Sequence, residues 1–75
     1  MRFPVYRKYA NGKSYFIITS DKTWTEYKQV GKRFEKHEFT ATQYPEMLFI
    51  QDLLKKNEGV LESNAFEISQ LSLAD

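Results

Sequence analysis

The chain has 75 residues, no cysteine and a formal net charge of +1. One domain fits this length. The stability that its core can supply is marginal, because a small domain leaves much of its surface exposed. The lack of cysteine excludes disulfides and thiolate metal sites, and we find neither a signal-like apolar start nor an apolar run near the roughly 18 residues of a membrane span. We therefore expect one cytoplasmic domain that does not enter a membrane.

The first predicted element is a β-hairpin. The dipeptide Asn11-Gly12 separates two strand-like stretches, residues 3–10 and 13–20. This dipeptide is typical of a type I′ turn, which needs positive φ at both central residues. We expect the two stretches to pair as antiparallel strands.

A second turn is predicted at Asp21-Lys22, followed by a strand over residues 23–30 that is rich in threonine and aromatic residues. The alternative for this stretch is a short helix capped by Ser20 or Asp21, because apolar residues recur there at every third position. The strand is the interpretation that we adopt.

Gly31-Lys32 then predicts a two-residue turn into a fourth strand, residues 33–41. This register places three complementary pairs across the two strands, each worth about 0.2–1 kcal/mol. The pairs are Lys28 with Glu35, Glu26 with His37, and Trp24 with Phe39.

The three turns combine into a four-stranded antiparallel meander, whose faces follow from the alternation of side chains along each strand. One face confines its charges to the edge strands: Phe3, Val5, Arg7, Tyr9, Phe16, Ile18, Tyr27, Phe34, Lys36 and Glu38. The other has charges at the sheet centre: Tyr6, Lys8, Ala10, Lys13, Tyr15, Ile17, Trp24, Glu26, Lys28, Val30, Arg33, Glu35 and Phe39. Because an unpaired buried charge costs more than an exposed ring, we expect the first face to pack on a helix and the second to face outward.

The longest apolar-periodic run predicts the main helix, over residues 44–57. Pro45 and Glu46 suit its first turn, and Gly59 is expected to supply the left-handed residue that ends it. Its apolar stripe consists of Met47, Phe49, Ile50, Leu53 and Leu54. The chain is thus expected to adopt an α+β fold, a four-stranded meander with this helix on one face and a short C-terminal helix.

The end of the chain carries weaker patterns. Residues 60–62 are extended in character and could cover a sheet edge. Asn64 and Glu67 have the spacing of a capping box, which predicts a last helix to about Leu71, although residues 66–69 also alternate like a strand. We expect residues 72–75 to fray.

No arrangement typical of catalysis is present. His37 is the only histidine and has no companion at a metal-ligand spacing, and the three glycines are isolated rather than gathered in a phosphate-binding loop. Glu46 and Asp52 are six residues apart on the predicted helix, so they do not form an acid/base pair. We expect no enzymatic activity, no metal and no cofactor.

The outward face provides the candidate interaction surface, which consists of Tyr6, Lys8, Lys13, Tyr15, Ile17, Trp24, Lys28, Arg33 and Phe39. Tyr6, Ile17, Trp24 and Phe39 form an apolar cluster within it, and a small monomer seldom leaves such a patch bare. Either the C-terminal segment or another chain is expected to cover this cluster, and we expect a protein partner or a second copy of the chain. The plainer interpretation is that these are ordinary solvated strand residues.

The alternative partner is single-stranded nucleic acid. In the predicted register four cations surround Tyr15, as in proteins that stack bases on aromatic rings and place cations along phosphates. Residues 1–37 carry nine Lys and Arg against three acids, whereas residues 38–75 carry two against seven. Those acids, and a sequence pI of about 7.9 where a dedicated nucleic-acid module has one above ~9, make this partner the less favoured one.

Three stretches, residues 9–16, 42–47 and 50–54, have the sequences YANGKSYF, TQYPEM and IQDLL. Together with their surroundings, about half of the chain, they resemble short single-domain hypothetical proteins from bacterial genomes. This resemblance implies a bacterial source and a single small domain, and it carries over no functional residue.

Overall fold

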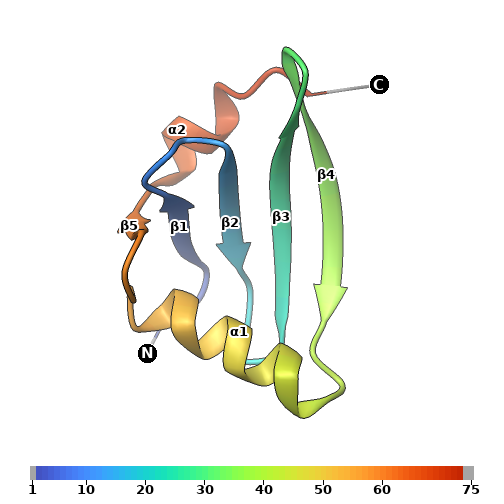
Figure 1. The fold of residues 1–75 in the computed structure, drawn as a ribbon, viewed down its shortest axis with the longest axis vertical. Coiled ribbons are helices and arrows are strands. Elements are labelled where there is room, and N and C mark those ends of the chain that lie inside the picture. The colour runs from blue at the N-terminus through green and yellow to red at the C-terminus, as the bar shows by residue number, and fades with distance from the viewer. Residues whose placement is uncertain (1, 74–75) are drawn as a thin grey trace.

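The computed structural model describes residues 2–73, and Figure 1 shows its elements. They are β1 (Val5–Tyr9), β2 (Ser14–Ile18), β3 (Thr23–Val30), β4 (Arg33–Thr40), α1 (Tyr44–Leu54), β5 (Val60–Glu62) and α2 (Ala65–Ser69). The strands form one antiparallel sheet in the order β4-β3-β2-β1-β5. The predicted α+β fold is confirmed, with a fifth strand where residues 60–62 cover the β1 edge.

Two of the three predicted registers are confirmed. Lys8 lies opposite Tyr15 in β1 and β2, and all three predicted pairs form between β3 and β4. Gly31, with a φ of 64°, supplies the two-residue turn between those strands. The first turn is not type I′, since only Gly12 has a positive φ there and its N–H donates to the Tyr9 carbonyl at 2.9 Å.

The predicted register between β2 and β3 is wrong by one residue. The loop contains three residues, Ser20 to Lys22, and Thr19 and Ser20 both donate their N–H to the Thr23 carbonyl. The Ser20 hydroxyl accepts the N–H groups of Lys22 and Thr23 at 3.1 and 3.0 Å. Because this hydroxyl satisfies two loop donors, the three-residue loop is favoured over the two-residue turn that Asp21-Lys22 suggested.

A shift of one residue moves every side chain of a strand to the other face. Trp24, which we expected outward, therefore lies on the face of Phe16 and Ile18, whereas Tyr27 lies on the opposite face with Tyr15. We call these faces the α1 face and the α2 face. The Arg7 guanidinium donates to the Leu53 carbonyl of α1 at 3.0 Å, whereas the Lys8 ammonium contacts α2.

Two of the charges that argued against this arrangement, those of Lys28 and Glu35, are accommodated by the position of α1. The helix crosses the strands at one end of the sheet, near the end of β4 (Figure 1). Lys28 and Glu35 lie toward the other end, next to the β3–β4 turn, where both are exposed. The α1 face can thus carry these charges because the helix covers only part of it.

The main core lies between the sheet and α1. Its buried residues are Phe16, Ile18, Trp24, Ala41, Ile50 and Leu53. Phe49 adds a ring at 5.9 Å from that of Phe16, in an edge-to-face arrangement. Full burial of an aliphatic or aromatic side chain contributes about 1.5–3 kcal/mol, so these few residues supply much of the stability of the domain.

The main helix is shorter than predicted. It begins as expected, with Pro45 in its first turn and the Glu46 carboxylate accepting the Gln43 N–H at 3.2 Å. It ends at Leu54, and Lys56 rather than Gly59 is the left-handed residue that follows the helix end, with a φ of 54°. Gly59, at 85°, belongs instead to the turn that leads into β5, which explains why it is a poor marker of the helix end.

The C-terminal segment packs on the α2 face. The Asn64 side chain caps α2 by accepting the Glu67 N–H at 2.8 Å, as predicted, and Ile68 is buried. Beyond α2 the Ser72 carbonyl accepts the Phe34 N–H at 2.7 Å and Leu73 bridges to Phe34. Fraying is therefore wrong for residues 72–73, and residues 74–75 lie outside the described residues.

Candidate interaction surfaces

The structure does not bring the nine residues of the candidate interaction surface onto one face. Tyr6, Lys8, Tyr15 and Ile17 lie on the α2 face. Trp24, Lys28, Arg33 and Phe39 lie on the α1 face, and Lys13 is exposed in the loop before β2. The one-residue shift between β2 and β3 causes this division.

Tyr15 is consequently not surrounded by cations. Its neighbour on β3 is Tyr27, and the ring of Phe34 stands edge-on to it at 5.8 Å. The Lys8 ammonium, opposite Tyr15 on β1, is bound by both carboxylate oxygens of Glu67 at 3.2 and 2.9 Å. That hydrogen bond raises the pKa of Lys8 and lowers the pKa of Glu67, so each group stabilises the charge of the other.

The predicted apolar cluster is also divided. Trp24 is buried between Phe39, whose ring stacks on the indole, and Phe49 of α1, whose ring centroid lies at 5.6 Å. Its indole Nε1 has no hydrogen-bond acceptor among residues 2–73. The C-terminal segment, one of the two covers considered for this cluster, does not lie over Trp24 but packs on the α2 face, where Tyr27 is buried.

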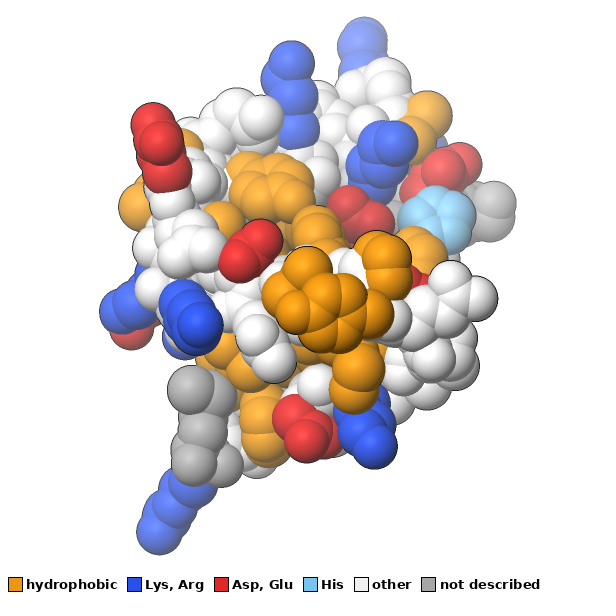
Figure 2. Space-filling model, turned by 60° about the horizontal axis from the view of Figure 1, so that its bottom comes forward, with side chains coloured by type: hydrophobic (Ala, Val, Ile, Leu, Met, Phe, Trp, Pro, Cys, Tyr) orange, Lys and Arg blue, Asp and Glu red, His pale blue; other side chains and the backbone are white. Residues whose placement is uncertain are grey.

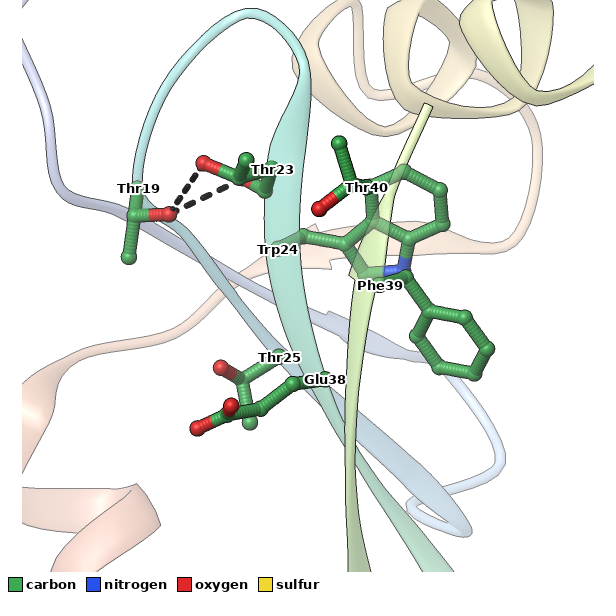
Figure 3. Close-up of a pocket in the computed structure, with 7 residues that line it drawn as sticks. All are labelled: Thr19, Thr23, Trp24, Thr25, Glu38, Phe39 and Thr40. Atoms are coloured by element: carbon green, nitrogen blue, oxygen red, sulfur yellow. Dashed lines mark hydrogen bonds between the residues drawn. The ribbon is translucent and has the colours of Figure 1, made fainter. Parts of the chain in front are cut away.

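A shallow cavity of about 290 Å³ opens where β2 and β4 end and β3 begins, beside the β2–β3 loop. Figure 3 shows Thr25 and Glu38 on one side of these strands and the rings of Trp24 and Phe39 on the other. The hydroxyl oxygens of Thr19 and Thr23 lie 2.6 Å apart, and that of Thr19 also donates to the Thr23 carbonyl. These hydroxyls are thus bonded within the chain rather than directed at a ligand.

Apolar side chains gather at the end of the molecule where α1 crosses the sheet. Tyr44 and Leu48 of α1 and Phe39 of β4 are exposed. Figure 2, which brings this end forward, shows hydrophobic side chains at the centre of the view, beside the pale blue ring of the only histidine, His37. The ring centroids of His37 and Phe39 lie 6.3 Å apart.

The outer edge of β4 adjoins this apolar region. The two-residue turn makes Val30 and Arg33 a hydrogen-bonded pair, so the odd-numbered residues of β4 direct their N–H and C=O groups at β3. The even-numbered residues direct theirs away from the sheet, as the Phe34 N–H does toward Ser72. Beyond Phe34, the outward groups of Lys36, Glu38 and Thr40 face no strand among residues 2–73.

Sequence reasoning missed these three residues, although a signal for them existed. A meander leaves its last strand at an edge, and the alternation of β4 then decides which backbone groups point outward. We considered the cover of one sheet edge by residues 60–62, but not which backbone groups of residues 33–41 point outward. Among the described residues no group of three or more His, Cys, Asp or Glu side chains could hold a metal ion.

Comparisons with protein-family models, with curated protein sequences and with solved structures found no match. None of the helices within residues 2–73 is long and apolar enough to span a membrane.

Proposed function

We propose that this protein is a noncatalytic interaction module that binds another protein chain by adding one of its strands to the outer edge of β4. The observation that carries the proposal is the row of outward N–H and C=O groups at Lys36, Glu38 and Thr40. An extended segment that pairs with such an edge gains backbone hydrogen bonds for affinity and side-chain contacts for specificity.

The two edges of the sheet differ in a way that supports this proposal. The β1 edge is covered by β5, a strand of three residues. The β4 edge belongs to a strand of eight residues, and within residues 2–73 only its beginning is covered, by Ser72 and Leu73. Uncovered edges of this length are templates for pairing with another chain.

The exposed rings of Phe39 and Tyr44 and the side chain of Leu48 lie at the end of the same strand and on the helix that follows. They would give an added strand apolar contacts beside its backbone hydrogen bonds. We further propose a cytoplasmic location, which the absence of cysteine supports.

Nucleic acid remains an alternative from the sequence, and no observation in the structure favours it. The basis of that alternative was a ring of four cations around Tyr15. Lys28 and Arg33 lie on the opposite face from Tyr15, and Glu67 binds Lys8.

Two proline variants test the proposed edge. Glu38→Pro removes an N–H that points outward from β4, so the pairing of β4 with β3 stays intact. Glu62→Pro is the matched control, since it removes a glutamate and an outward N–H from β5 at the opposite edge. Equal far-UV circular dichroism and thermal unfolding would establish that both variants fold.

Wild type and both variants are then immobilised and exposed to lysate of the cells that produce the protein, and the retained proteins are identified by mass spectrometry. We expect that wild type and Glu62→Pro retain at least one protein that Glu38→Pro does not retain. That protein can be a second copy of this chain. Equal retention of every protein by all three would contradict the proposal.

A further inference from the structure

We infer that the chain added to the β4 edge is a second copy of this protein, paired antiparallel through β4 with His37 on the two-fold axis. The inference rests on the proposed function and names its partner. A two-fold dimer of this kind uses the same strand in both copies, so each contact occurs twice. The two sheets then continue across the dimer as one.

The backbone limits the registers that such a pair can take. Only the even-numbered residues of β4 direct their backbone groups outward, so hydrogen-bonded pairs join even-numbered residues of the two copies. With Lys36, Glu38 and Thr40 as the outward residues, the strands can therefore be centred on Lys36, His37, Glu38 or Phe39. Pairing cannot extend to Phe34, because Ser72 already occupies its N–H.

Charge selects among the four registers. A centre at Lys36 or at Glu38 places that charged residue opposite its own copy, which brings two like charges together. A centre at Phe39 places Glu38 opposite the partner's Thr40 and so forms no pair of opposite charges. A centre at His37 places Lys36 opposite the partner's Glu38, and symmetry repeats this pair. Both side chains are exposed, by 51% and 75%, and within one chain they form a long ion pair with nitrogen and oxygen 3.8 Å apart, which the pair across the dimer would replace.

In the register centred on His37, the residues Lys36 and Glu38 form two hydrogen-bonded pairs with their partners. The two His37 residues form the non-hydrogen-bonded pair between them, where Cα atoms lie about 4.5 Å apart. The contact is short, so the dimer should exchange with the monomer at micromolar concentrations rather than be permanent.

Charge reversal gives the first test, by sedimentation equilibrium over a range of concentrations. Lys36→Glu places two glutamates opposite each other, and Glu38→Lys does the same with two lysines. Each variant alone should associate at least roughly tenfold more weakly than wild type. An equimolar mixture of the two, and the double variant, should regain association because both restore opposite charges at every pair.

A cysteine scan gives the second test and determines the register, because the chain has no cysteine of its own. Cα atoms about 4.5 Å apart lie within the range that a disulfide can bridge. Under mild oxidation His37→Cys should form a covalent dimer rapidly. Lys36→Cys and Glu38→Cys should form it slowly, and rapid dimer formation by either one instead would overturn the register.

Wild-type protein that stays monomeric at millimolar concentration would overturn the inference. In that case the lysate experiment decides the fate of the proposed function. If Glu38→Pro fails to retain some other protein that wild type retains, the proposed function still stands. If no protein distinguishes Glu38→Pro from Glu62→Pro, the proposed function fails as well.

Discussion

The indole ring of Trp24 stacks on the phenyl ring of Phe39, with centroids 5.3 Å apart and an angle of 18° between the planes. The two residues lie opposite each other in β3 and β4, as the sequence predicted. Trp24 is buried, whereas Phe39 is partly exposed. Phe39 thus forms the outer cover of the core at the strand edge that we propose for binding.

Phe39→Ala should expose Trp24 without unfolding the protein. The loss of the stacked pair should lower the free energy of unfolding by about 1 kcal/mol beyond the loss of buried area. Urea denaturation and the emission of this single tryptophan would measure both effects, with a red shift expected. Phe39→Tyr keeps a ring in place, so a similar red shift in that variant would contradict the explanation.

Phe16→Ala and Ile50→Ala should each cost about 2–5 kcal/mol of unfolding free energy, because both side chains are fully buried in the main core. Such a loss approaches the whole stability of a domain this small. Thermal and urea unfolding would measure it. Phe66→Ala, at a side chain that is 73% exposed, is the control and should change little. Comparable losses for Phe16 and Phe66 would contradict the assignment of the core.

Ser20→Ala tests the loop that sets the register of β2 and β3. The variant leaves the N–H groups of Lys22 and Thr23 without their acceptor, which should cost about 0.5–1.5 kcal/mol. Ser20→Asp keeps an acceptor at this position and should recover much of the loss. Equal stability of wild type and Ser20→Ala would show that another contact determines the loop.

Local chemistry explains what the sequence predicted correctly. Gly31 marked a two-residue turn, Asn64 and Glu67 marked the start of a helix, and residues 23–30 formed a strand as preferred. Each of these depends on a few neighbouring residues, whose conformational preferences are visible in the sequence.

The incorrect predictions were choices between alternatives of nearly equal energy. A two-residue and a three-residue loop are both compatible with Ser20-Asp21-Lys22, and the two loops place each side chain of β3 and β4 on opposite faces of the sheet. We used buried charge to orient the sheet, but the short helix α1 leaves part of its face open, so this criterion did not apply. The candidate interaction surface was dispersed by the same single-residue shift.

The contact between Lys8 and Glu67 should make the docking of α2 depend on pH. Because folding lowers the pKa of Glu67, its ionised carboxylate stabilises the fold at pH values above the ordinary carboxyl pKa of 4.5. This contribution is lost as the pH falls through the pKa of the folded state. The raised pKa of Lys8 acts in the opposite sense, so its contribution is complete below 10.5 and is lost above the folded value.

Glu67→Gln should therefore unfold more easily than wild type near neutral pH, with faster amide exchange in α2. The difference should shrink in acid, once Glu67 of the wild type is protonated. Glu58→Gln, at an exposed loop position, should match wild type at both pH values. A difference between Glu67→Gln and wild type that persists unchanged in strong acid would rule out the charge of Glu67 as its cause.

Titration of a labelled, mixed-sequence single-stranded oligonucleotide tests the rival function. Four cations around Tyr15 would neutralise about four phosphates, and log K against log salt would then have a slope near −3. Because the structure divides these cations between two faces and Glu67 binds Lys8, we expect neither that slope nor any effect of Tyr15→Ala on binding. Tight binding in low salt that Tyr15→Ala weakens without changing the slope would contradict the separation of the two faces and restore nucleic acid as the partner.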